Sequence, residues 1–140
     1  DRETGLAAVF NDIAERIHRC GLVIVLSDLF DEPGRILQAL HHLRFRKHEV
    51  LVFHIMAGEE LAFPFDRWSL FHDLEVDGRS VEIDPRSIRA TYLDEVRRFL
   101  KTLEKGCGEM KIDYVPISTQ QDFAVTLTQY LAQRRRRVKT

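Results

Sequence analysis

Asp28 is the residue best placed for chemistry, because it closely follows Leu22–Leu26, the most apolar stretch of this 140-residue chain. Five consecutive apolar residues, several of them β-branched, predict a strand buried on both faces, as in a parallel sheet. Open α/β sheets bind ligands at the carboxyl ends of their strands, which makes Asp28 a candidate ligand position. On the residues alone, the competing interpretation is a loop carboxylate that caps a helix. Asp31, three residues further on, is expected to cap the helix that contains Ile36.

An enzymatic interpretation of the same strand end is the main alternative. A strand-end aspartate can accept a phosphoryl group as a nucleophile. Hydrolases of that kind carry a second aspartate two residues later, where this chain has Phe30. Ser27 is not part of a G-x-S-x-G elbow, and the sequence contains no glycine-rich phosphate loop. A phosphoryl-transfer or hydrolytic enzyme that uses Asp28 stays an alternative, and a non-enzymatic role is expected.

The histidines and cysteines favour neither a zinc site nor a disulfide framework. His41, His42, His48 and His54 show no His-x-x-x-His spacing, so a solvated or half-buried role is expected for them. Two cysteines are too few and too dispersed for a disulfide scaffold, which favours a reducing, cytoplasmic location. Cys107 falls on an apolar helical stripe and is expected in the core.

Charge and hydropathy exclude several classes of partner. The formal net charge is −1, so no global field favours nucleic acid or an anionic membrane. The basic run 134–137 is expected to be the solvated last turn of a terminal helix, where cations complement the helix dipole. No apolar run approaches the ~20 residues that span a bilayer.

Apolar periodicity and turn residues predict alternating helices and strands around Asp28. A first helix is expected over roughly residues 5–19, with Thr4 as a candidate N-cap. Pro33 opens a second helix, and Pro85 opens a long third helix that ends at Gly106 or Gly108. Further strands are expected over residues 50–55 and 112–117, and a last helix contains Phe123, Leu127, Tyr130 and Leu131.

Two features refine this order. Pro116 lacks an N–H donor, so the strand over residues 112–117 belongs at a sheet edge or a strand terminus. Residues 58–84 interrupt the alternation, and Asp77-Gly78 within them predicts a small β-hairpin excursion. Four aromatic residues of this excursion are expected to belong to the core or to cover the end of the sheet, and any that are exposed form a candidate partner surface: Phe63, Phe65, Trp68 and Phe71.

The predicted fold class is α/β, with three layers (α/β/α) and a mainly parallel sheet. Three strands with four helices make a thin sheet, because such sheets average nearer five or six strands. The first helix has no strand before it, and one edge of the Leu22–Leu26 strand is expected to lack a partner. We therefore expect residues 1–140 to be the C-terminal portion of a domain truncated at its N-terminus. The alternative is a fragment without independent function that self-associates through the Leu22–Leu26 edge.

Several segments resemble the bacterial domain-of-unknown-function family fifty-eight. The likeness is carried by residues 21–33 (GLVIVLSDLFDEP), 47–54 (KHEVLVFH), 61–65 (LAFPF), 84–85 (DP), 106–107 (GC) and 112–115 (IDYV). It covers nearly the whole chain. The family looks like a branch of the von Willebrand factor A-type fold, which is Rossmann-like.

The resemblance implies a function and half of a metal site. In the von Willebrand A-type fold a metal-ion-dependent adhesion site takes an Asp-x-Ser-x-Ser element, a threonine and an aspartate. Asp28 matches the aspartate, and Thr4 matches the threonine, although Gly5 stands where the family usually has aspartate. The Asp-x-Ser-x-Ser element is absent from residues 1–140, so Mg²⁺ or Mn²⁺ is expected only in a longer protein. The implied role is a protein-interaction module that works with a MoxR-type AAA+ ATPase in chaperone or assembly activity.

Overall fold

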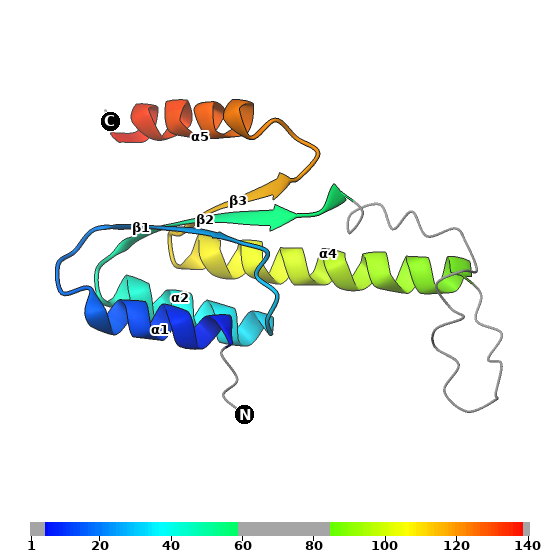
Figure 1. Ribbon diagram of the computed structural model, residues 1–140, viewed down its shortest axis with the longest axis horizontal. Coiled ribbons are helices and arrows are strands. Elements are labelled where there is room, and N and C mark those ends of the chain that lie inside the picture. Colours follow the sequence, from blue (N-terminus) through cyan, green and yellow to red (C-terminus); the bar gives the residue numbers. More distant parts are fainter. Residues whose placement is uncertain (1–4, 59–84, 139–140) are drawn as a thin grey trace.

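The computed structural model describes residues 5–58 and 85–138, which form a three-stranded parallel sheet covered by helices on both faces (Figure 1). The strands are β1 (Leu22–Ser27), β2 (Glu49–Met56) and β3 (Asp113–Ser118), in the spatial order β1-β2-β3. The helices are α1 (Leu6–Arg16), α2 (Pro33–Phe45), α4 (Pro85–Glu109) and α5 (Phe123–Val138). The predicted α/β class and three-layer arrangement are confirmed.

The two faces of the sheet are covered unequally. Among the described helices, α1, α2 and α4 pack on one face and α5 packs on the other (Figure 1). Side chains alternate along β2, so Val50 and Val52 point into the three-helix face while Leu51 and Phe53 point toward α5. All four of these side chains are buried, which makes β2 the central strand of the core.

Helix α2 begins and ends with local signals in the sequence. Pro33 is its first residue, as predicted, because a proline at that position lacks only an N–H that would have no partner in the helix. At its other end Lys47 adopts a left-handed backbone with φ 64°. The N–H of Lys47 donates to the carbonyl of Arg44, and the N–H of His48 donates to that of Leu43, the pair of bonds of a Schellman cap.

Helix α4 passes through both glycines that were expected to end it and stops at Glu109. Lys111 provides the left-handed residue instead, with φ 56°. Gly106 lies against α2: a Cβ at this position would lie 2.5 Å from Leu37 Cδ2, so any other residue would require the Leu37 side chain to shift. A Cβ at Gly108 would meet nothing within 4 Å.

Other expectations need correction. Helix α1 ends at Arg16 rather than near residue 19, because Ile17 takes an extended backbone, and its N-cap is Gly5 rather than Thr4. Strand β1 is not buried on both faces, since Leu22, Ile24 and Leu26 are about half exposed on the α5 side. Pro116 is in β3, which is an edge strand as predicted.

The predicted hairpin over residues 58–84, with its aromatic residues Phe63, Phe65, Trp68 and Phe71, lies almost entirely outside the described residues, as does Thr4. Among the helices that the structure describes, none combines the length and the apolar character needed to cross a membrane.

Candidate functional site

The turn after β1 is held by hydrogen bonds and projects two side chains outward. Leu29 has a left-handed backbone with φ 52°, which costs a residue with a Cβ roughly 1–2 kcal/mol. Its side chain is only 1% exposed, so burial in the core offsets that cost. Ser27 Oγ accepts from the Leu29 N–H at 3.0 Å, and Asp28 Oδ1 accepts from the Phe30 N–H at 3.2 Å. Asp28 is exposed as a result, and the Phe30 side chain is 93% exposed.

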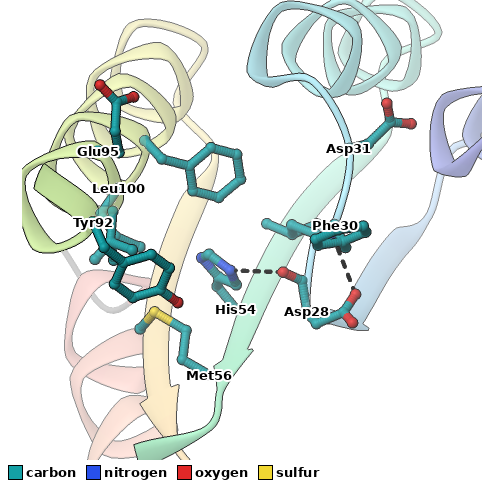
Figure 2. Close-up of a pocket in the computed structure, with 11 residues that line it drawn as sticks. Asp28, Phe30, Asp31, His54, Met56, Tyr92, Glu95 and Leu100 are labelled. Carbon is teal, nitrogen blue, oxygen red and sulfur yellow. Dashed lines mark hydrogen bonds between the residues drawn. The ribbon is translucent and has the colours of Figure 1, made fainter. Parts of the chain in front are cut away.

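His54 fixes the backbone of this turn from the neighbouring strand. Its Nε2 lies 2.9 Å from the carbonyl oxygen of Asp28, as Figure 2 shows, and its Nδ1 lies 2.6 Å from the hydroxyl of Tyr114. A carbonyl oxygen only accepts, so Nε2 donates to it, and in the neutral imidazole Nδ1 then accepts from the Tyr114 hydroxyl. Burial, with smaller contributions from Cys107 and Glu104, raises the pKa of Tyr114 and keeps that donor protonated. One buried imidazole therefore connects β1, β2 and β3.

Asp31 lies against α1 instead of capping α2. Its Oδ1 accepts from the N–H of Glu32 at 2.7 Å, and Glu32 is the N-cap residue of α2. Its Oδ2 is buried and has no hydrogen-bond partner among the described residues. A Cβ at Gly5 would lie 3.2 Å from that oxygen, which places the carboxylate beside the first residues of α1, where the helix dipole favours negative charge. The predicted capping role of Asp31 is therefore wrong.

A pocket of about 440 Å³ opens beside this turn, between the carboxyl ends of β1 and β2 and the middle of α4 (Figure 2). Its wall from α4 is mainly apolar and includes Val96, Phe99 and Leu100, and Met56 adds to it from β2. Among the described residues that line it, the carboxylates are those of Asp28, Asp31 and Glu95, and there is no lysine or arginine. The pocket therefore combines an apolar wall with negative charge, and it suits a ligand that is apolar and cationic or that brings a metal ion.

The described residues supply only part of a metal shell. Mg²⁺ prefers several oxygen ligands in octahedral geometry. Asp28 offers an exposed carboxylate, but the carboxylates of Asp28 and Asp31 do not point toward one another in Figure 2. Within residues 5–58 and 85–138 there is no group of three histidine, cysteine or acidic side chains that could hold a metal. A metal site at Asp28 thus needs further oxygen donors from outside these residues.

Sequence reasoning missed the role of the buried histidines. His48 and His54 were expected to be solvated or half-buried, but both are buried in the structure. His54 lies within the apolar run of β2, and its place near the carboxyl end of the strand predicted over residues 50–55 was the available signal. Its partner Tyr114 comes from β3, 60 residues away, and no spacing in the sequence links the two.

Comparison with known proteins identifies a family. The family model described as "Protein of unknown function DUF58" matches residues 1–102. No curated protein and no solved structure matches the chain significantly.

Proposed function

Because the chain belongs to the DUF58 family of proteins of unknown function, we propose that it is a non-enzymatic protein-docking module. The observation that carries this proposal is the turn after β1. It presents an exposed carboxylate, Asp28, beside an aromatic ring, Phe30, that is 93% exposed. Interface hot spots are typically aromatic side chains held in a fixed position and surrounded by further contacts.

The backbone of the turn is arranged for such a role. The bond from His54 to the Asp28 carbonyl and the two side-chain bonds within the turn restrict its motion before any partner arrives. Such preorganisation lowers the entropy lost on binding. The left-handed backbone at Leu29 is a further sign, since strained conformations cluster at functional sites.

We propose further that docking is assisted by a divalent cation, Mg²⁺ or Mn²⁺. In this proposal the domain is von Willebrand A-like, and Asp28 is one ligand, Thr4 supplies a hydroxyl, and the remaining donors come from outside residues 1–140. The bound cation would provide a positive centre that binds a carboxylate of the partner protein. Hard cations accept such oxygen ligands readily.

The proposed partner is a MoxR-type AAA+ ATPase, and the proposed setting is a cytoplasmic chaperone or assembly system. The support is the family resemblance of residues 21–33, which contain the turn. The acidic side chains around the neighbouring pocket also fit a partner surface that carries cations or a shared metal ion.

The test is a binding measurement with the MoxR-type ATPase of the same organism, in Mg²⁺ and in excess chelator, on a polypeptide extended to include the proposed outside donors. Phe30→Ala should weaken binding by roughly thirtyfold, the loss expected for a hot-spot aromatic. Asp28→Asn should remove the Mg²⁺ dependence. The matched control is Asp12→Asn, because Asp12 is an exposed carboxylate on α1 that pairs with Arg16.

Two results would contradict the proposal. The first is equal binding by the Asp28→Asn and Phe30→Ala variants and the unchanged chain, or no binding by any of them. The second is metal-dependent turnover of p-nitrophenyl phosphate that disappears in Asp28→Asn, which would establish the enzymatic alternative.

A further inference from the structure

All four helices that the structure describes end where the strands of the sheet begin, on the left of Figure 1. Contacts between distant segments hold this end of the molecule together. Arg44 Nε donates to the carbonyl of Met110 at 3.0 Å. The N–H of Glu49 donates to the carbonyl of Gly21 at 2.9 Å, and the Glu49 carboxylate pairs with Arg134. The surface formed here, which we call the basic end, comprises residues 18–20, 44–49, 109–113 and 134–137.

The basic end concentrates positive charge in a chain whose net charge is −1. It contains nine lysine and arginine residues and three carboxylates. Part of the positive charge complements the helix dipoles, because cations are favoured near the carboxyl ends of helices. Arg134 and Arg137 also pair with the carboxylates of Glu49 and Asp113. The remaining cations still outnumber the carboxylates, so this end has a positive field that the net charge of the chain does not reveal.

Phe45 gives the basic end an apolar projection. It is the last residue of α2 and is 77% exposed, whereas Leu40 and Leu43 of the same helix are fully buried. Arg46 and Lys47 follow it directly, and both are exposed. Aromatic residues and arginine are enriched at the centres of protein–protein interfaces, where an aromatic ring commonly fills a pocket of the partner. Phe45 and its two cationic neighbours therefore form a candidate anchor.

The opposite end of the sheet carries a surface of complementary character. The pocket of about 440 Å³ opens there, at the carboxyl ends of β1 and β2 (Figure 2). Its apolar wall includes Val96 and Phe99 and suits an aromatic ring. Three carboxylates line it, those of Asp28, Asp31 and Glu95, without a lysine or arginine among its described lining residues. A group that is both aromatic and flanked by cations matches the apolar wall and the charge of this pocket.

We propose that copies of this chain associate head to tail, with the basic end of one copy seated on the pocket of the next. Phe45 of one copy packs against the apolar wall from α4 of the other. Arg46 and Lys47 then lie beside the carboxylates of Asp28 and Glu95, with their aliphatic stems along the apolar surface. The two surfaces differ, so the contact is heterologous, and each pair of copies keeps one free anchor and one free pocket.

A second copy accounts for more of these features than other occupants do. A nucleic acid would bind the cations of the basic end but would leave Phe45 and the distant pocket unused. A small cationic ligand would fill the pocket but would leave Phe45 exposed. The chain itself carries both halves of the contact, and they match in apolar character and in charge. The inference does not rest on the proposed docking function, because the association needs neither a metal ion nor another protein.

Sedimentation equilibrium in excess chelator, without any other protein, tests the contact. The average mass should rise with protein concentration at low salt and fall toward that of the monomer at high salt, because salt screens the attraction between exposed charges. Phe45→Ser should weaken the association roughly tenfold or more, the loss expected for an aromatic anchor. Leu131→Ser is the matched control, because Leu131 is another exposed apolar residue, 52% exposed, and belongs to neither surface.

A substitution at the pocket should have the same effect and allows a mixing experiment. Glu95→Lys places a cation where Arg46 and Lys47 would lie, so this variant should also be monomeric. Glu104→Lys is its control, because Glu104 is an exposed carboxylate of α4 that does not line the pocket. The Phe45→Ser variant keeps an intact pocket, and the Glu95→Lys variant keeps an intact anchor. An equimolar mixture of the two should therefore form a dimer that grows no further.

Three results would overturn the proposal. The first is an unchanged chain that stays monomeric at every concentration up to about 1 mM, the limit of weak specific binding. The second is association that persists in both Phe45→Ser and Glu95→Lys, which would assign the contact to another surface, such as the free edge of β1. The third is a mixture of the two variants that stays monomeric, because a head-to-tail contact requires that one intact anchor and one intact pocket suffice.

Discussion

His54 and Asp28 are joined by a hydrogen bond of 2.9 Å that runs from a buried imidazole to a backbone carbonyl. His54 is the one buried polar side chain among the described residues that line the pocket. The bond holds it behind Asp28, whose carboxylate is exposed. Asp28 is therefore held through its main chain, and its side chain stays available. The predictions below test this relationship and the packing around it.

Replacing His54 by alanine should lower the free energy of unfolding by about 2–4 kcal/mol. The substitution leaves the Asp28 carbonyl and the Tyr114 hydroxyl without a partner and creates a cavity between Tyr114 and Phe99. Urea denaturation measures the loss, and His41→Ala at an exposed position of α2 is the control. A double-mutant cycle with Tyr114→Phe should show a coupling of about 1 kcal/mol, and additive losses would contradict the bonded pair.

Replacing Lys47 by glycine should stabilise the protein by about 1 kcal/mol. Lys47 has φ 64°, a backbone conformation that glycine adopts without the steric cost of a Cβ. Thermal and urea unfolding measure the gain. Arg46→Gly is the matched control, because Arg46 has φ −73° and glycine should bring no benefit there. Equal effects of the two substitutions would show that the Schellman cap is not the cause.

The two glycines of α4 should respond in opposite ways to alanine. Gly108→Ala should stabilise the helix by roughly 0.5–1 kcal/mol, since alanine is the better helix former and its Cβ meets nothing within 4 Å. Gly106→Ala should destabilise by roughly 1–3 kcal/mol, because the new methyl group overlaps Leu37. Stability measurements on both variants decide this, and Gly106→Ala combined with Leu37→Ala should recover part of the loss.

Only one of the two cysteines should react with a thiol reagent in the native protein at pH 8. Cys20 is exposed, whereas Cys107 is buried and its burial raises the thiol pKa from 9.0 to about 11. Ellman's reagent should therefore label one thiol in buffer and two in denaturant. Rapid labelling of Cys107 in buffer would mean that the contact between α4 and the sheet opens readily.

The same pKa difference gives stability a defined dependence on pH. Between about pH 9 and 11 the Cys107 thiol ionises in the unfolded chain but stays neutral in the folded one. The unfolded state then binds fewer protons, so the free energy of unfolding falls as the pH rises through this interval and is unaffected below it. Denaturation midpoints at pH 8, 9, 10 and 11 test this, and Cys107→Ala should reduce the fall.

Much of the fold could be predicted because its signals are local. Pro33 and Pro85 begin helices, and Pro116 lies in an edge strand, because a missing N–H has the same consequence wherever the chain goes. Helix ends were predicted less well. Gly106 and Gly108 are of the residue type that commonly ends helices, yet α4 continues past both, and the residue with a left-handed backbone is Lys111.

The candidate site was predicted only in part. Asp28 could be singled out because it follows an apolar run that predicts a strand, and the carboxyl ends of parallel strands lie at one edge of the sheet. The roles of His54 and Tyr114 could not be predicted, since they depend on the register between β2 and β3. The exposure of Phe30 depends on the left-handed backbone of Leu29. A leucine does not indicate that conformation in a sequence.

By itself, then, the sequence determined the α/β class, the parallel direction of its strands and the strand end that carries Asp28, because hydrophobic periodicity and proline act over a few residues. Tertiary structure alone decided that β1 is an edge of the sheet formed by the described residues and has a half-exposed apolar face, that His54 supports the turn, and that Gly106 lies against Leu37. Each of these depends on which segments meet in space, and the energy of such contacts comes from residues that lie far apart in the chain.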